Sequence, residues 1–328
     1  MTALAPLLQG LFTDRLAQRG VSPHTTAAYR DSWRLLLGFV HRQRGISPVA
    51  LDLTDLDAGM IGAFLDHLEQ ARGNSIRTRN MRLVAIHALF DYAALRCPEH
   101  AGLIAQVLAI PAKRSQATIV TFLTRPEAQA LLAAPDRSTA LGRRDHLLLS
   151  LAIQTGLRVS ELTALTWNDL SLGVGAHVLC NGKGRKQRCT PLTKSVASLA
   201  DDWARETQPA PTDPVFVSRL GGRLGRHAVA DLLSKYATTA ATTCPTLATK
   251  HISPHTLRHT AAMDLLQAGV DTSVIALWLG HANTRSTQPY LHADLTIKER
   301  ALARTAPDEA ARHRYQPSDP LLAFLESL

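Results

Sequence analysis

The chain has 328 residues, enough for about two domains with separate hydrophobic cores. Apolar residues make up 45% of it, yet no apolar run approaches the ~18 residues of a membrane span, which excludes a membrane protein. The net charge of +9 and the pI near 9.8 favour a polyanionic partner, above all nucleic acid, over a merely basic protein.

The four cysteines are scattered and form no C-x-x-C pair, which indicates free thiols in a reducing compartment. The N-terminal stretch MTALAPLLQGLFTDR has no basic segment before its apolar part, so we expect no signal peptide and a cytoplasmic location. We also expect no metal and no cofactor. The sequence contains neither ligands at metal-binding spacing nor a G-x-x-x-x-G-K-[ST] phosphate loop.

Residues 1–112 are predicted to be wholly helical and to form a small bundle. Apolar residues recur at helical spacing, and Ser22 followed by Pro23 is typical of a helix start. The expected helices lie at 4–18, from 22 through 40, and at 57–70, 75–94 and 101–108.

A group of arginines lies in the second half of this bundle, at Arg72, Arg77, Arg79 and Arg82. A basic helix face can lie against a phosphate backbone, and it can equally be a solvated surface. These four residues are therefore candidates for DNA contacts, with the solvated face as the alternative.

A linker and a second domain follow the bundle. The polar and basic stretch PAKRSQA at 111–117 predicts a linker, which we place at 113–122, with the second domain at 123–304. Thr124 and Glu127 have the spacing of a capping box that starts a helix. Further helices are predicted at 138–154, 193–206 and 226–242, and strands at 118–122, 176–180, 188–192 and 214–218.

The turn NGKGRK at 181–186 joins two of these strands and carries Lys183, Arg185 and Lys186. The fold class predicted for the whole chain is mainly α with a small β-sheet, an α+β domain preceded by a helical bundle. Residues 305–319 are polar, and 321–328 form a short apolar segment.

The stretch from Ser253 to Tyr290 concentrates the residues suited to chemistry. Ser253 and Pro254 start a helix whose first turn carries His255 and Arg258 on one face. A second helix ends at 280, directly before His281. Helix N-termini and forked arginine donors are good phosphate ligands, so the stretch indicates a phosphate site.

Cleavage of a phosphodiester without a metal needs a nucleophile and charge neutralisation. Tyr290 can act as the nucleophile and form a phosphotyrosine. Arg158 and Arg258 can each donate to the non-bridging oxygens and stabilise the pentavalent state. Each residue alone is more often a surface or core residue, so only the combination favours this chemistry.

The same reaction needs an acid for the leaving group and groups that orient the phosphate. Lys183, on the basic turn, can protonate the leaving 5′ oxygen. His255 and His281 can orient the phosphate and assist the tyrosine proton. Lys186 is a rival for the lysine role.

Four motifs occur in one order: TGLRVSEL (155–162), NGKGRKQR (181–188), SPHTLRHT (253–260) and LGHANTRSTQPY (279–290). Together they resemble the tyrosine recombinase family of phage integrases and Xer-like enzymes, over about residues 120–300. Residues 1–112 resemble the helical core-binding domain of that family.

The resemblance implies roles position by position. Arg158 and Arg258 match the two catalytic arginines, and Lys183 matches the lysine between strands. His255, His281 and Tyr290 match the two histidine positions and the nucleophile. Glu161 matches an acidic position that supports the active site, with capping of its own helix as the alternative. Arg185 and Lys186 are candidate DNA contacts.

The resemblance also implies a two-domain clamp around double-stranded DNA and a homotetramer on paired DNA sites. Residues 305–328 would be a tail whose apolar end docks either on its own domain or on the next protomer. A second recombinase or an accessory DNA-bending protein is a further candidate partner. The implied function is a site-specific recombinase or integrase that acts through a 3′-phosphotyrosine in integration, excision or transposition of a mobile element. The alternatives are a type IB-like topoisomerase and a non-catalytic DNA-binding protein on the same scaffold.

Overall fold

The computed structural model describes residues 2–114, 120–181, 187–280 and Tyr290. The chain divides into two compact units, Met1–Ala117 and Thr118–Leu328, and the division falls inside the segment 113–122 predicted as a linker. Each unit has a buried core of its own. Within the described ranges, no helix is long and apolar enough to cross a membrane.

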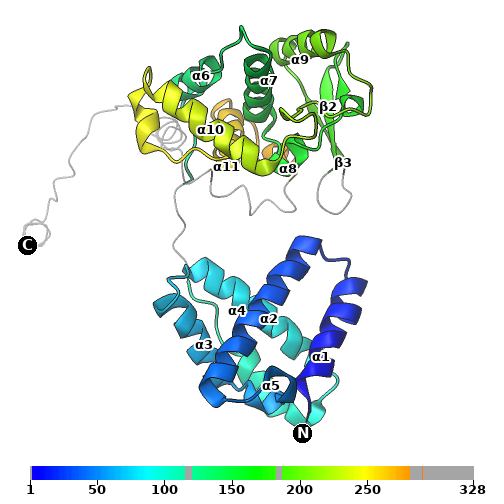
Figure 1. Ribbon diagram of the computed structural model, residues 1–328, viewed down its shortest axis with the longest axis vertical. Coiled ribbons are helices and arrows are strands. Elements are labelled where there is room, and N and C mark those ends of the chain that lie inside the picture. Colours follow the sequence, from blue (N-terminus) through cyan, green and yellow to red (C-terminus); the bar gives the residue numbers. More distant parts are fainter. Residues whose placement is uncertain (1, 115–119, 182–186, 281–289, 291–328) are drawn as a thin grey trace, which may run out of the picture. The chain divides into compact units, whose positions relative to one another are not determined.

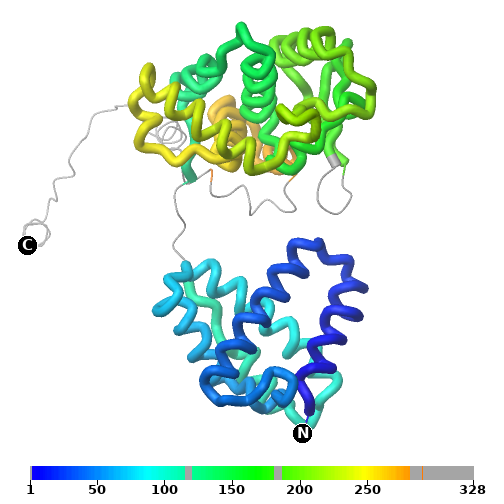
Figure 2. The backbone as a smooth tube through the Cα atoms, viewed as in Figure 1, coloured from blue at the N-terminus to red at the C-terminus, as the bar shows by residue number. Residues whose placement is uncertain are grey.

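The first unit is a helical bundle, as predicted. Its α-helices are α1 (Leu4–Gly10), α2 (Pro23–Arg44), α3 (Ala58–Gln70), α4 (Ile76–Ala93) and α5 (Ala101–Leu108) (Figure 1). A π-helix, Leu11–Leu16, continues α1 so that the two trace one helical segment in Figure 2. Short 3₁₀ turns lie at Pro48–Ala50, Leu53–Asp55 and Pro98–His100.

Local chemistry explains where these helices begin. The Ser22 side chain accepts a hydrogen bond from the Thr25 amide, and Pro23 takes the first helical position. The helices then bury apolar faces against one another, with α4 packed on α2, α3 and α5. The Trp33 indole is 2% exposed and donates to the Ala85 carbonyl oxygen at 3.3 Å, which ties α2 to α4.

The second unit contains seven described α-helices around its own core (Figure 1). They are α6 (Arg125–Ala133), α7 (Ala140–Thr155), α8 (Val159–Leu162), α9 (Lys194–Thr207), α10 (Arg226–Ala241), α11 (Pro254–Gln267) and α12 (Thr272–Leu279). 3₁₀ turns lie at Trp167–Asp169 and Pro245–Thr249. The predicted capping box forms, since Glu127 accepts from the Thr124 amide. Ser253, predicted to start α11, accepts from the Thr256 amide.

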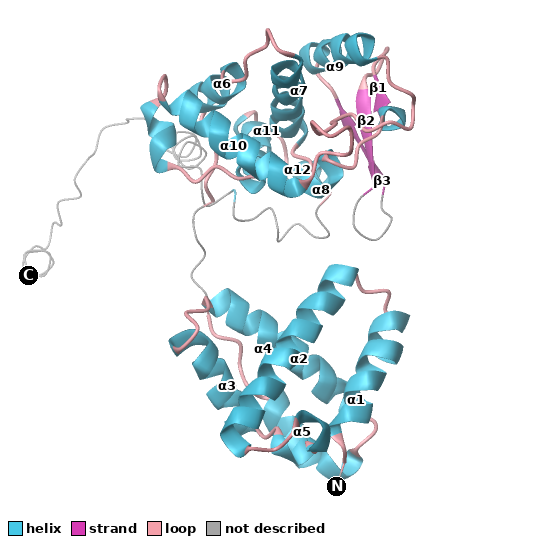
Figure 3. Cartoon of the chain, in the orientation of Figure 1, coloured by secondary structure: helices cyan, strands magenta, loops and turns pink. Residues whose placement is uncertain are grey.

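A small antiparallel sheet lies at one side of this unit, away from α6 (Figure 3). Its strands are β1 (Leu170–Ser171), β2 (His177–Asn181) and β3 (Gln187–Pro191), in the order β1-β2-β3. Leu179 pairs with Cys189, so β2 and β3 are antiparallel neighbours, as predicted for the strands on either side of 181–186. β3 also packs against α12, which brings the sheet to the end of that helix.

Two predicted strands differ from the structure. Residues 214–218 form only the isolated bridges Thr166–Pro214 and Val217–Arg223, because their partners meet them at single positions. Residues 120–122, the described part of the strand predicted at 118–122, are not in a strand. The two-residue β1, in contrast, was not predicted, because it is too short to show an alternating pattern.

Candidate active site

The site forms where the ends of α7 and α12 meet α11. α7 ends at Gly156, whose φ is +63°, and a Cβ there would lie 2.6 Å from Leu279 Cδ2 and 3.0 Å from Ala261 Cβ. Only glycine allows both the left-handed turn and this close approach. The glycine therefore brings the residues that follow α7 close to the other two helices.

Two arginines donate hydrogen bonds to the carbonyl oxygens at these helix ends. Arg258 donates through Nη1 to the Gly156 oxygen and through Nη2 to the Leu279 oxygen, both at 2.7 Å. Arg158 donates through Nη2 to the Gly280 oxygen at 3.0 Å. The C-terminal end of a helix carries free carbonyls and a partial negative charge, so both α7 and α12 favour cations there.

Glu161 holds two arginines together. Its carboxylate accepts from Arg158 Nη1 at 2.8 Å, from Arg188 Nη2 at 2.6 Å and from the Arg158 amide at 2.8 Å. Burial alone would raise the pKa of Glu161, but the hydrogen bonds from Arg188 and Arg158 and the charge of Arg188 outweigh it and lower that pKa to about 2. The carboxylate is therefore ionised at neutral pH.

The cluster carries more positive than negative charge. Arg258 is 5% exposed, and burial, followed by the charge of Arg158, lowers its pKa to about 10. Arg188 adds to this repulsion, while Glu161 opposes it. Guanidinium groups held together around a single carboxylate leave an excess that an anion would neutralise.

Tyr290 lies beside α11. It is 3% exposed, and its hydroxyl oxygen lies 3.0 Å from Nδ1 of His259. The two rings meet edge-on with centroids 5.5 Å apart, and the ring of His255 lies 6.4 Å from that of His259. Burial raises the pKa of Tyr290, against the opposing charge of Arg258.

The structure thus brings Arg158, Glu161 and Arg258 into one charged cluster. Tyr290 lies against the same helix as Arg258 and the exposed His255. The other predicted positions, Lys183, Arg185, Lys186 and His281, lie outside the described residues. No role was predicted from the sequence for Arg188 or His259. Two sequence signals could have identified them. The alternation of side chains along β3 places Arg188 on one face of the sheet, and His259 lies four residues after His255 on the same helix face.

The four arginines predicted to contact DNA, Arg72 in the turn after α3 and three on α4, divide into two kinds. Arg72 and Arg77 are exposed. Arg79 is buried, donates to the Pro111 oxygen at 3.1 Å and pairs with Glu69. Arg82 donates to the Ala28 oxygen and to Ser32. Arg79 and Arg82 are thus engaged inside their own unit, because their neighbours offer carbonyl and carboxylate acceptors.

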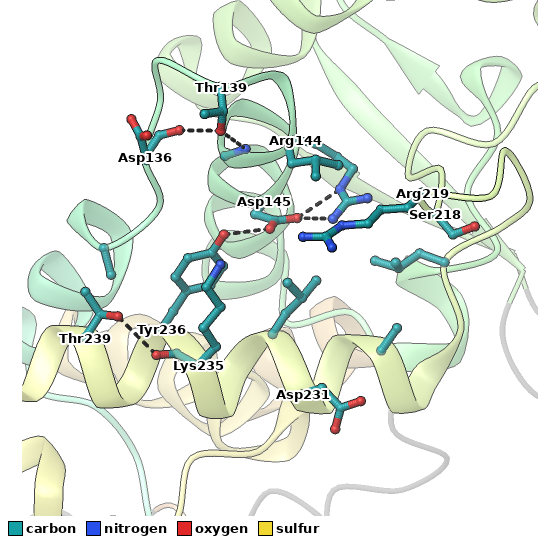
Figure 4. Close-up of a pocket in the computed structure, with 16 residues that line it drawn as sticks. Asp136, Thr139, Arg144, Asp145, Ser218, Arg219, Asp231, Lys235, Tyr236 and Thr239 are labelled. Atoms are coloured by element: carbon teal, nitrogen blue, oxygen red, sulfur yellow. Dashed lines mark hydrogen bonds and ion pairs between the residues drawn. The ribbon is translucent and has the colours of Figure 1, made fainter.

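A pocket lies elsewhere in the second unit, between α7, α10 and the loop before α10 (Figure 4). Asp145 accepts there from Arg144 at 2.6 Å and from the Tyr236 hydroxyl at 2.7 Å. None of the predicted catalytic residues lines this pocket. Its buried charges are satisfied by one another, so they hold α7 to α10 and the chemistry is expected elsewhere.

The comparisons with known proteins agree with this geometry. Residues 121–296 match the phage integrase family, and residues 10–96 match the phage integrase N-terminal SAM-like domain. The chain belongs to the phage integrase family, which confirms the resemblance to tyrosine recombinases.

Relatives match over nearly the whole chain. The integrase/recombinase y4rC of Sinorhizobium fredii is 52% identical over 99% of this chain and 98% of its own length. The tyrosine recombinase XerC of Pelobacter propionicus is 34% identical over 89% of this chain and 93% of its own.

Solved structures share the fold. The XerH recombinase bound to its difH substrate after cleavage aligns with a TM-score of 0.65 at 23% identity, over 83% of this chain and 78% of that one. A lambda integrase dimer bound to a core site aligns with a TM-score of 0.64 at 19% identity, over 89% of this chain and 96% of that one.

Proposed function

We propose that the chain is a site-specific DNA recombinase that cuts and rejoins DNA through a 3′-phosphotyrosine at Tyr290. The observation that carries this is the placement of a buried tyrosine against the helix of Arg258, which belongs to a cluster with excess positive charge. A protein that only binds DNA can use a tyrosine hydroxyl to contact a phosphate, but it does not need the complete set of Arg158, Arg258 and a buried Tyr290. The names of the full-length relatives support the same activity.

The chemistry of each side chain suits it to a different role in the proposed reaction. Arg158 and Arg258 neutralise the phosphate, since each guanidinium has N–H groups beyond those bonded to carbonyls and to Glu161. Glu161 keeps the arginines in place against their repulsion. His255 and His281 orient the phosphate, and Lys183 protonates the leaving 5′ oxygen, with Lys186 as the competing candidate.

The partner is double-stranded DNA, contacted outside the active site by Arg72, Arg77, Arg185 and Lys186. Strand exchange takes place in a homotetramer on paired DNA sites, in the cytoplasm, and the tail at 305–328 is a candidate contact between protomers. Integration, excision and transposition of a mobile element are the natural reactions. A transposon integrase among the structures of the same fold is consistent with this proposal.

Covalent trapping tests the proposal. Wild-type protein and the variant Tyr290→Phe are each mixed with fragmented DNA of the source organism and denatured, and the DNA still attached is sequenced. We expect attached DNA for the wild type only, with equal DNA binding in both. Tyr236→Phe is the matched control, because it removes a hydroxyl bonded to Asp145 in the same unit.

Other outcomes separate the alternatives. Binding without any attached DNA would favour a non-catalytic DNA-binding protein. Attached DNA at many sites, with relaxation of supercoiled plasmid and no exchange between two trapped sites, would favour a type IB-like topoisomerase.

A further inference from the structure

The contact between α11 and the tyrosine passes through His259, to which none of the roles above is assigned. Nδ1 of His259 lies 3.0 Å from the Tyr290 hydroxyl oxygen, within hydrogen-bond distance. Tyr290 is 3% exposed and packs with Met263 and Leu266 of the same helix. The histidine thus touches the oxygen that the proposed function uses as its nucleophile.

The protonation states suit a proton acceptor. Burial, followed by the charges of His255 and Arg258, lowers the pKa of His259 to about 4, so its ring is neutral near pH 7. A neutral imidazole with its proton on Nε2 presents a lone pair at Nδ1. The tyrosine, whose pKa is raised by burial, retains its proton and can donate it to that lone pair.

We propose that Nδ1 of His259 accepts the Tyr290 proton when the phenolic oxygen attacks the scissile phosphate. The inference rests on the proposed function and adds a base to it. The bond between Tyr290 Oη and phosphorus forms as the bond between phosphorus and the 5′ oxygen breaks. One proton moves from Oη to Nδ1, and the leaving 5′ oxygen receives another from the lysine acid. Rejoining reverses both transfers.

The charges around the histidine explain how a weak base becomes effective. In the described part of the chain, the titratable and charged groups that face it are His255, Arg258 and Tyr290. Without DNA, the positive charge of Arg258 disfavours the imidazolium. A bound phosphate would add negative charge at the same place, which raises the basicity of the ring at the moment of attack.

The test compares His259→Ala with His259→Asn. The asparagine amide can place an oxygen close to the position of Nδ1, so it keeps an acceptor but cannot take up a proton. The rate of covalent complex formation is measured from pH 6 to pH 10 on a site recovered by trapping, together with DNA affinity. His251→Ala, which alters an exposed histidine just before α11, is the matched control.

We expect both His259 variants to form the complex about 10²- to 10⁴-fold more slowly than wild type at pH 7.5, with unchanged DNA affinity. The deficit should shrink toward pH 10, because the rising hydroxide concentration increasingly replaces the histidine as the base that removes the tyrosine proton. A substrate with sulfur in place of the leaving 5′ oxygen needs no acid. It should rescue a variant that lacks the lysine acid and leave the His259 variants slow.

Three results would overturn the proton transfer. A His259→Asn rate equal to wild type would mean that the hydrogen bond only positions the tyrosine. Equal rates in wild type and both variants would mean no role in cleavage. Rescue of His259→Ala by the sulfur substrate would assign the residue to the leaving group. Binding without adduct in the wild type itself would overturn the proposed function, and the proton transfer with it.

Discussion

Arginines gather in both units, but they are held in different ways. On α4, Arg79 and Arg82 donate to carbonyl oxygens of their own unit. In the second unit, Arg158 and Arg188 come from different elements and share the carboxylate of Glu161. Arg258, which is buried, lies close enough to feel the charge of both. Cations kept together against their repulsion are suited to bind an anion, whereas cations spread along a helix join parts of a fold.

Among the substitutions that test this contrast, replacement of Arg258 should have the largest effect on strand cleavage. In Arg258→Ala we expect strand cleavage to fall by about 10²- to 10³-fold, because the variant lacks a group that neutralises the phosphate. DNA affinity should change far less. The free energy of unfolding should also fall by about 1–3 kcal/mol for each buried carbonyl left without its donor, here those of Gly156 and Leu279.

The measurements are covalent trapping, gel shift and denaturant unfolding. Arg143→Ala is the control, since this arginine pairs with Glu206 at the surface of the same unit. Equal losses in cleavage and in DNA binding would mean that Arg258 contributes only to DNA binding and not to the chemical step.

Glu161→Gln should have the next largest effect, on stability. The pKa of Glu161 is lowered to about 2 from an ordinary 4.5, so its ionised form contributes about 3 kcal/mol at neutral pH. Because the folded pKa is depressed, this contribution is complete above about pH 4.5 and disappears as the pH falls toward 2.

Unfolding at several pH values measures this directly. The difference in stability between wild type and Glu161→Gln should be largest at pH 7. It should decrease as the pH falls from 4.5 and disappear toward pH 2. Glu206→Gln, which breaks the surface ion pair with Arg143, is the control and should show a much smaller change with pH, because solvent screens that pair. A difference that does not depend on pH would show that the charge of Glu161 does not hold the arginines.

The smallest effects are expected for the arginines of the first unit, where stability and the salt dependence of DNA binding should distinguish buried from exposed arginines. Arg79→Ala should lower the free energy of unfolding by about 1–3 kcal/mol, because the Pro111 carbonyl loses its donor. It should leave the salt dependence of DNA binding unchanged. Replacing both Arg72 and Arg77 by alanine should keep stability within about 0.5 kcal/mol. It should also lower the salt slope by about 0.9 for each phosphate that the protein no longer neutralises.

Binding titrations between 50 and 200 mM salt check both expectations. A weaker salt slope in Arg79→Ala, with no loss of stability, would mean that this arginine contacts DNA after all.

The same contrast shows what could be predicted from the sequence. Helix starts follow from local chemistry, so Ser22 with Pro23 and Ser253 with Pro254 were sufficient to predict α2 and α11. Arg158 and Arg258 were predicted through the motifs around them. The burial of Arg79 was not, because it depends on residues 111–113 folding back onto α4.

Arg188 and His259 were not recognised for a similar reason. Arg188 gains its role from α8, which carries Glu161 27 residues earlier in the chain, and His259 gains its role from a tyrosine 31 residues later. Spacing within a motif indicates which residues share a face. It does not show which distant segment that face meets.

The most direct test of the central claim is to identify the residue that carries the DNA. Trapped complexes are digested with nuclease and trypsin, and the peptide at 286–298, in which Tyr290 is the sole tyrosine, is analysed by mass spectrometry. We predict a nucleotide joined through its 3′ phosphate to Tyr290, with a free 5′ hydroxyl on the released strand. A nucleotide on any other residue, or a 5′ linkage, would contradict the assignment of Tyr290 as the nucleophile.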